Sequence, residues 1–155
     1  MSQTVLITGA SNGIGKACAR VFARKGYDLV LVARHREKLE AVKAELSEYD
    51  VQIKVIAMDL TGEDAAVDLY NDLVLDDINI DILVNNAGFG DNGAFHDSSW
   101  EKQKKMVLLN IVALMQMTYV FGQAMKRRKK GRILNVASIA GLCAGPYMST
   151  YYATK

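Results

Sequence analysis

Short runs rich in Val, Ile and Leu alternate with longer amphipathic stretches along the whole of this 155-residue chain. Two parallel strands need a connection of about a dozen residues or more, usually a helix, so this alternation is typical of a series of βαβ units. The pattern therefore predicts an α/β fold. The strands are predicted at residues 4–8, 29–33, 52–58, 81–85 and 132–137, and the helices at 13–25, 36–48, 62–77 and 99–128.

The apolar character of the predicted strands indicates how the layers are arranged. Each strand is a nearly continuous apolar run, as expected where helices cover both faces of a sheet. Right-handed crossovers place the helices on both of those faces. We therefore predict a doubly wound parallel sheet of the Rossmann-like type with strand order 3-2-1-4-5, in a single domain that spans residues 1–155.

The charge and cysteine content exclude several classes of partner. The 19 Lys and Arg residues nearly balance the 17 Asp and Glu residues, and the basic run 126–130 is expected to be a solvated helix end, so no nucleic-acid partner is predicted. Cys18 and Cys143 lie far apart without CxxC or Cys/His spacing, so neither a metal site nor a disulfide framework is expected. Together with the lack of a secretory leader, this pattern favours a cytoplasmic protein.

One stretch, residues 106–122, is apolar almost all round. It is about 17 residues long and contains Asn110 and Gln116, whereas a transmembrane helix needs roughly 20 predominantly apolar residues, so no membrane span is predicted. A helix that is apolar on all sides in a soluble protein is buried on one side and needs cover on the other. We therefore expect a homodimer or a homotetramer.

A glycine-rich turn directly follows the first predicted strand and opens a helix, reading Thr8-Gly9-Ala10-Ser11-Asn12-Gly13-Ile14-Gly15. Such a turn lets backbone N–H groups approach a pyrophosphate, and the helix N-terminus adds a favourable partial charge. A turn that only packs a helix against a strand is the alternative. The position at the end of the first strand of a βαβ unit favours a dinucleotide site. The predicted cofactor-binding residues here are Gly9, Ser11, Asn12, Gly13, Ile14 and Gly15.

The spacing of these glycines, TGxxxGxG rather than GxGxxG, resembles the short-chain dehydrogenase/reductase family, and four further features match that family. They are Asn85-Asn86-Ala87-Gly88 after the fourth strand, Asn110 within the long helix, Ser138 after the fifth strand, and Tyr151-Tyr152-Ala153-Thr154-Lys155, which has the YxxxK form. Ser138 precedes Tyr151 by thirteen residues, as in the family. The resemblance covers residues 4–155 and extends to bacterial NADP(H)-dependent ketoreductases.

This resemblance implies an oxidoreductase that interconverts a carbonyl and an alcohol of a small-molecule substrate by hydride transfer. Tyr151 would be the acid/base, Ser138 would hydrogen-bond the carbonyl oxygen, and Lys155 would hold the nicotinamide ribose and lower the pKa of Tyr151. Asn110, the fourth implied catalytic residue, would order a relay water. The implied cofactor contacts in this half of the chain are Asn86, Ala87, Gly88, Tyr151 and Lys155.

The residues after the second predicted strand indicate which nicotinamide cofactor fits. NAD(H) sites of this type place a carboxylate there for the ribose 2′-OH, whereas this chain reads Val32-Ala33-Arg34-His35-Arg36. A guanidinium suits a phosphate, so NADP(H) is favoured over NAD(H), with Arg34 as the phosphate ligand. By the resemblance, Asp59 and Leu60 would meet the adenine. An Asp at a strand end is equally often a helix cap, so two interpretations of Asp59 stay open.

Members of the resembled family are longer than this chain, which ends at the lysine of YxxxK. We therefore expect the C-terminal strands of the full family fold to be absent and the strand 132–137 to be an edge of the sheet. The helix that carries Tyr151 and Lys155 would have barely one turn and should fray. The alternative function is accordingly a nucleotide-binding fragment without turnover.

Overall fold

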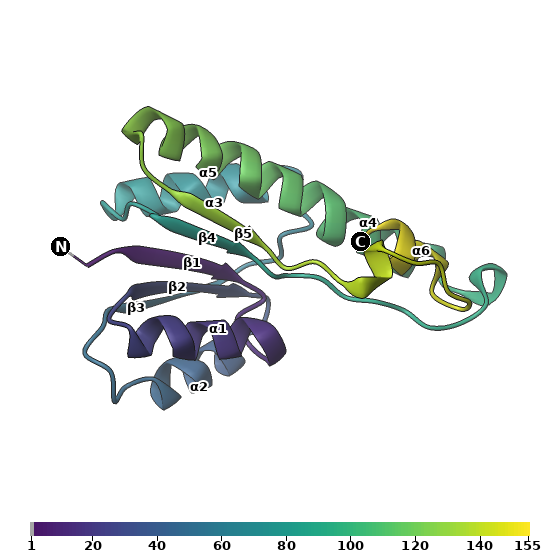
Figure 1. Ribbon diagram of the computed structural model, residues 1–155, viewed down its shortest axis with the longest axis horizontal. Coiled ribbons are helices and arrows are strands. Elements are labelled where there is room, and N and C mark those ends of the chain that lie inside the picture. Colours follow the sequence, from purple (N-terminus) through teal and green to yellow (C-terminus); the bar gives the residue numbers. More distant parts are fainter. Residues whose placement is uncertain (1) are drawn as a thin grey trace.

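A five-stranded parallel sheet forms the centre of the molecule in the computed structural model, which describes residues 2–155 (Figure 1). The strands lie in the order β3-β2-β1-β4-β5, and every neighbouring pair is parallel. The predicted α/β class and strand order are therefore confirmed. The strands are β1 (Thr4–Thr8), β2 (Asp28–Ala33), β3 (Ile53–Ala57), β4 (Ile82–Asn85) and β5 (Arg132–Asn135).

Helices cover both faces of this sheet. In Figure 1, α1 and α2 lie below it and α3 and α5 lie above it, while α4 and α6 extend past the ends of the strands. The helices are α1 (Gly13–Arg24), α2 (Arg36–Glu45), α3 (Ala65–Leu75), α4 (Trp100–Val107), α5 (Leu114–Arg128) and the five-residue α6 (Ser149–Ala153). Shorter helical segments are η1 (Phe95–Asp97), the π-helix η2 (Leu108–Ala113) and η3 (Ile139–Gly141).

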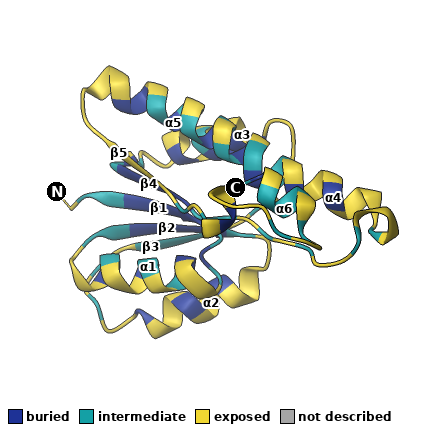
Figure 2. Ribbon diagram, turned by 45° about the vertical axis from the view of Figure 1, so that its right-hand side comes forward, coloured by how far each residue is buried: buried dark blue, intermediate teal, exposed yellow. Residues whose placement is uncertain are grey.

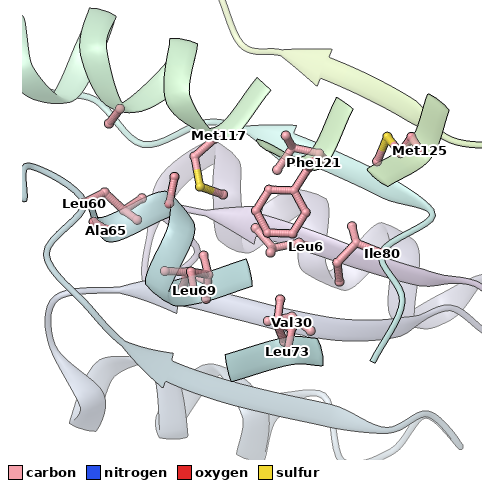
Figure 3. Close-up of a cluster of buried hydrophobic side chains, with 14 residues drawn as sticks. Leu6, Val30, Leu60, Ala65, Leu69, Leu73, Ile80, Met117, Phe121 and Met125 are labelled. Carbon is pink, nitrogen blue, oxygen red and sulfur yellow. The ribbon is translucent and has the colours of Figure 1, made fainter. Parts of the chain in front are cut away.

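The buried side chains form two apolar layers, one on each face of the sheet. Successive residues of a strand point to opposite faces, so Leu6 and Val30 join one layer while Val5 and Ile7 join the other. Figure 3 shows the first layer, in which Phe121 of α5 packs among side chains of α3 and of the strands. Figure 2 shows the result, with buried strands at the centre and exposed outer helix faces.

The long helix predicted at 99–128 is confirmed apart from its first residue, and it contains a π-helical segment. Helical structure runs without a break from Trp100 to Arg128, over 29 residues, so α4, η2 and α5 form one rod. Its most apolar window has a mean hydropathy of 1.4 and is 28% buried, so by length and composition alone it could cross a membrane. A core helix passes the same test, and α5 buries Met117 and Phe121 against the sheet, so the absence of a membrane span stays a prediction.

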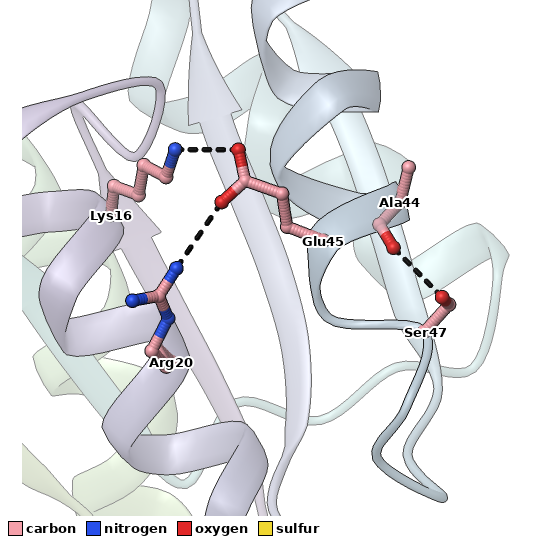
Figure 4. Close-up of polar contacts among 5 residues, drawn as sticks. All are labelled: Lys16, Arg20, Ala44, Glu45 and Ser47. Atoms are coloured by element: carbon pink, nitrogen blue, oxygen red, sulfur yellow. Dashed lines mark hydrogen bonds and ion pairs between the residues drawn. The ribbon is translucent and has the colours of Figure 1, made fainter.

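Two helices are shorter than predicted. α2 ends at Glu45 because Ser47 closes its last turn, with Ser47 Oγ donating to the Ala44 carbonyl at 2.7 Å (Figure 4). α3 begins at Ala65 rather than at residue 62, because the preceding backbone first makes a turn in which the Asp59 carboxylate accepts from Thr61 N at 3.0 Å. In both places a short polar side chain competes with the helix for a backbone group.

An ion-pair cluster joins α1 to α2 on the outer surface (Figure 4). Lys16 Nζ and Arg20 Nη2 donate to the two oxygens of Glu45 at 2.6 and 3.2 Å. The hydrogen bond from Lys16 holds the pKa of the Glu45 carboxyl below its ordinary value. Because all three side chains are solvent-exposed, this cluster fixes the two helices relative to each other with little net stabilisation.

β5 is an edge of the sheet within residues 2–155, as expected. It pairs with β4, and all four of its residues are exposed. α6 has the expected single turn, and its fraying stays a prediction.

Asp81 ties the amino end of β4 to its neighbours. Its carboxylate accepts a hydrogen bond from Thr4 N at 3.1 Å and pairs with Lys130 Nζ at 2.9 Å. Burial raises the pKa of Asp81, but the hydrogen bonds from Lys130 and Thr4 outweigh burial and hold the pKa below its ordinary value. Asp81 therefore stabilises the fold in its ionised form.

We expect Asp81→Asn to lower the free energy of unfolding by about 1 kcal/mol near pH 7, since a part-exposed charged hydrogen bond contributes on this order. Because the folded-state pKa is depressed, the stabilisation is fully present above the unfolded-state pKa of about 3.9 and is lost as pH falls through the folded-state value. Urea unfolding of both proteins near pH 7 and near pH 3 measures the difference, which should shrink at the lower pH. An equal difference at both pH values would contradict this account.

Candidate functional site

A cavity of about 490 Å³ opens at the carboxyl ends of the strands, toward which the strand arrowheads in Figure 1 point. It lies where the connections from neighbouring strands β1 and β4 lead to opposite faces of the sheet, the usual place for a ligand in a doubly wound fold. Gly13, Gly15, Asn110 and Ser138 lie outside its lining. The predicted site residues that line it are Gly9, Ser11, Asn12, Ile14, Arg34, Asp59, Leu60, Asn86, Ala87, Gly88, Tyr151 and Lys155.

The glycine turn and the turn after β4 are packed directly against each other. Gly9 has φ +65°, and a Cβ placed there would lie 2.9 Å from Ala87 Cα. The amide of Asn86 donates to the carbonyls of Thr8 and Gly9 at 3.0 and 3.2 Å. Thr8 Oγ1 in turn accepts from the backbone N–H groups of Asn86 and Ala87. The two turns therefore hold each other in place.

The N-terminus of α1 is open toward the cavity. Asn12 is its N-cap but makes no side-chain capping bond. Within residues 2–155 the backbone N–H groups of Gly13, Ile14 and Gly15 donate no hydrogen bond, and the first bond of the helix is Lys16 N to Asn12 O at 3.1 Å. Unpaired N–H groups at a helix N-terminus, with the positive end of the helix dipole, favour a bound anion.

Gly15 is required because no side chain fits at its position. A Cβ there would lie 2.3 Å from Gly9 O and 2.5 Å from Asn86 Nδ2, so the glycine turn would have to move. We expect Gly15→Ala to lower the free energy of unfolding by about 1–3 kcal/mol, as overpacking does, and to distort the anion site. Gly62→Ala is the matched control, since its nearest neighbour would be 3.7 Å away. Thermal unfolding measures both, and equal effects would contradict this role of Gly15.

One end of the cavity is cationic. Arg34, His35 and Lys38 line it, and neither Arg34 nor Lys38 makes an ion pair within residues 2–155. Arg36, by contrast, pairs with Glu40 at 3.4 Å. Sequence reasoning missed Lys38, although its spacing of four from Arg34, across the start of a predicted helix, was an available signal.

Asp59 lines the cavity and is not a helix cap. Its carboxylate accepts from both N and Oγ1 of Thr61, at 3.0 and 2.9 Å, while the N-cap of α3 is Asp64. Burial raises the pKa of Asp59, but the hydrogen bonds from Thr61 and the positive charge of Arg34 outweigh burial and lower the pKa. The helix-cap interpretation was therefore wrong.

Tyr151 and Lys155 line the other end of the cavity. Lys155 Nζ lies 6.0 Å from the centre of the Tyr151 ring and donates to the Val136 carbonyl at 3.5 Å. Ser138, which follows β5, does not line this cavity. Its Oγ accepts from Ala140 N at 3.1 Å at the start of η3, so its hydroxyl hydrogen is not used by that bond.

Asn110 lies in the π-helix and joins two segments that are distant in the sequence. Its side-chain amide accepts from Phe89 N at 3.1 Å and donates to Phe89 O at 2.9 Å. The same amide donates to Thr154 Oγ1 at 2.9 Å, and Thr154 Oγ1 donates to the Tyr151 carbonyl at 2.9 Å. Because both amide hydrogens are used, a relay water at Asn110 could accept no hydrogen bond from this side chain. π-helical turns of this kind are frequent at functional sites.

Sequence reasoning did not assign Phe89, Gly90 or Thr154 to the site. Phe89 and Gly90 line the cavity next to Tyr151, and Thr154 holds Asn110. No group of three or more His, Cys, Asp or Glu side chains that could hold a metal ion occurs in the described part of the chain. Three parts therefore meet at one cavity. They are the open N-terminus of α1, called the anion cradle below, the cations Arg34 and Lys38, and the pair of Tyr151 and Lys155.

Comparisons with known proteins agree with this geometry. The family model for short chain dehydrogenase matches residues 3–155. Very-long-chain 3-oxoacyl-CoA reductase of Coccidioides immitis (strain RS) is 34% identical, over 97% of this chain and 44% of the relative. The chain spans about half the length of the curated relatives it matches.

Two solved structures are similar over nearly the whole chain. A short-chain dehydrogenase from Sphingobium yanoikuyae in complex with NADPH is 38% identical with a TM-score of 0.91, covering 99% of this chain and 60% of that one. The bulky-bulky ketone specific alcohol dehydrogenase from Comamonas testosteroni is 37% identical with a TM-score of 0.91, covering 99% of this chain and 61% of that one.

Proposed function

The chain belongs to the short chain dehydrogenase family, and on that basis we propose that it is an NADP(H)-dependent oxidoreductase that interconverts a carbonyl compound and an alcohol. The observation that carries this proposal is that Tyr151 and Lys155 line the same cavity as the glycine turn and the free cation Arg34. A proton donor, an anion cradle and a phosphate-binding cation are the parts that such a reaction needs in one place.

The residues at the cavity fit a dinucleotide phosphate. Gly9 and Gly15 let the glycine turn pack closely against Asn86 and Ala87, and the unpaired N–H groups of α1 would bind a pyrophosphate. Arg34 and Lys38 would hold a 2′-phosphate, since no carboxylate stands at the end of β2 to take the ribose hydroxyl of NAD(H). The similar enzyme from Sphingobium yanoikuyae binds NADPH, which supports this preference. When bound, NADP(H) would supply or accept the hydride.

Tyr151 would transfer the proton between its phenol oxygen and the substrate oxygen. Lys155, whose Nζ lies 6.0 Å from the centre of the Tyr151 ring, would hold the nicotinamide ribose beside the tyrosine. Ser138 would donate its free hydroxyl hydrogen to the same substrate oxygen and so stabilise negative charge that develops there. Asn110 would keep Phe89 and α6 in register around these groups.

Fluorescence titration with NADPH and NADH, followed by NADPH oxidation with a panel of ketones, aldehydes and a 3-oxoacyl thioester, tests the proposal. We expect tighter binding of NADPH than of NADH and loss of NADPH absorbance with at least one carbonyl compound. Binding without turnover on any compound would favour the alternative function, a nucleotide-binding fragment. No binding of either nucleotide would contradict both.

We also propose that the chain self-associates through the outer face of α5. Val112, Met115 and Tyr119 recur at helical spacing and are exposed, which leaves an apolar stripe uncovered. We expect a homodimer, and Tyr119→Lys should make it a monomer at the same concentration, because it places a charge in the contact. Light scattering after size-exclusion chromatography measures the mass, with Leu75→Lys on exposed α3 as the control. A monomeric wild-type chain would contradict this.

The cytoplasmic location remains a prediction.

A further inference from the structure

The loop between β4 and η1, residues 88–93, touches the segment that carries Tyr151. A Cβ built on Gly90 would lie 3.1 Å from Tyr151 Cδ2 and 3.3 Å from Cγ, so the tyrosine ring rests directly on the loop backbone. Further along, Gly93 N donates to the Tyr147 carbonyl at 2.8 Å. One side of this loop therefore forms part of the wall that limits where the Tyr151 ring can lie.

The other side of the loop is fixed to α4 by Asp91. Lys102 Nζ donates to Asp91 Oδ1, and Gln103 Nε2 donates to Oδ2 at 3.1 Å. The Asp91 side chain is 17% exposed and Gln103 is buried, whereas the Lys102 side chain is about half exposed. The hydrogen bond from Lys102 lowers the pKa of Asp91, which keeps both oxygens available as acceptors.

α4 belongs to a long helix that is packed against the sheet, so its contact with Asp91 fixes the position of the loop. It continues through the π-helix into α5, whose side chains Met117 and Phe121 are packed into the apolar layer above the sheet. The loop is also held at Phe89 by Asn110, about two turns further along the same helix. The loop is therefore fixed to this helix on one side, and on the other side its Gly90 backbone contacts the Tyr151 ring.

We propose that Asp91 is a positioning residue for Tyr151, acting through its bonds to Lys102 and Gln103 and through the backbone of Gly90. Asp91 touches neither the phenol oxygen nor the cofactor cavity, so it takes no part in proton transfer itself. This inference rests on the proposed function only for its catalytic consequence. The placement of the tyrosine ring can be tested without turnover.

The first arm of the test is NMR of protein labelled at tyrosine Cζ, which gives one resonance for each of the seven tyrosines. The Tyr151 resonance is identified by its loss in Tyr151→Phe. We expect Asp91→Ala to shift or broaden this resonance while that of Tyr27, which packs on Phe22 far from the loop, stays in place. The double variant Asp91→Lys, Lys102→Asp should restore it, because the ion pair is remade with reversed charges.

Asp97→Ala is the matched control, since Asp97 is an exposed carboxylate whose contact is the exposed His96. If Asp91→Ala does not fold, Lys102→Met serves instead, because it keeps the Gln103 bond and should give a smaller shift of the same resonance. An unchanged Tyr151 resonance in the folded variant would overturn the proposal.

The second arm of the test is kinetic and requires that the wild-type chain catalyses the reduction of a carbonyl compound. A ring displaced by about 1 Å should lower kcat by on the order of 10- to 100-fold, with the Kd of NADPH within about twofold of wild type. Equal losses in kcat and in NADPH affinity would point to general loosening and overturn the positioning role. If the wild-type chain binds NADPH without turnover, the proposed function fails while the NMR arm still decides the role of Asp91.

Discussion

Tyr151→Phe should lower kcat by about 10²- to 10⁴-fold, the range expected when a general acid is removed. The variant keeps the aromatic ring, so the contact with Gly90 remains and the cavity keeps its shape. It removes the phenol oxygen, which is the proposed proton donor. The Kd of NADPH should stay within about threefold, because the anion cradle and the cationic end are untouched. Steady-state kinetics with the best carbonyl compound and fluorescence titration measure the two quantities.

Tyr152→Phe is the control, as it removes the neighbouring hydroxyl and leaves Tyr151 intact. The Tyr152 hydroxyl lies against Gly145, where a Cβ would come within 2.2 Å of it, so its role is packing. We expect kcat of this variant to stay within about threefold of wild type. Full activity of Tyr151→Phe, or an equal loss in both variants, would contradict the assignment of Tyr151.

The double variant Arg34→Ala, Lys38→Ala should raise the Kd of NADPH by about 10²- to 10⁴-fold and leave the Kd of NADH within about threefold. Each cation would give the 2′-phosphate a charge-assisted hydrogen bond, worth about 1.5–3 kcal/mol, and NADH lacks that phosphate. Both side chains line the cavity without an ion-pair partner within residues 2–155, so their removal breaks no ion pair. Fluorescence titration with both nucleotides measures the change in preference.

Arg36→Ala is the matched control for this pair. Its guanidinium is turned to Glu40 and does not line the cavity, so we expect less than about a twofold change in either Kd. Arg34→Ala and Lys38→Ala should each give a loss of NADPH affinity between that of wild type and that of the double variant. A similar loss for NADPH and NADH in the double variant would show that these residues support the fold of the site rather than the phosphate.

Some residues of the candidate site could be predicted from the sequence, and others could not. The turn with Gly9 and Gly15, and the pair Tyr151 and Lys155, follow from spacings within a few residues, and the structure brings them to one cavity. Arg34 was singled out by its place after a strand. Lys38 was missed and the side-chain bonds of Asn110 were not predicted, because both depend on neighbours that come from other elements.

The layers and the glycine turn could be predicted because they depend on hydrophobic periodicity and on backbone conformations that few residues adopt, which are properties of short segments. The strand order was predicted from the doubly wound fold type. Three features became known from the folded chain alone: Asn110 bonds Thr154 across 44 positions, α4 holds Asp91, and Ser138 lies outside the cavity lining. Such contacts depend on how rigid elements pack against one another, and a side chain has no preferred distant partner until that packing is complete.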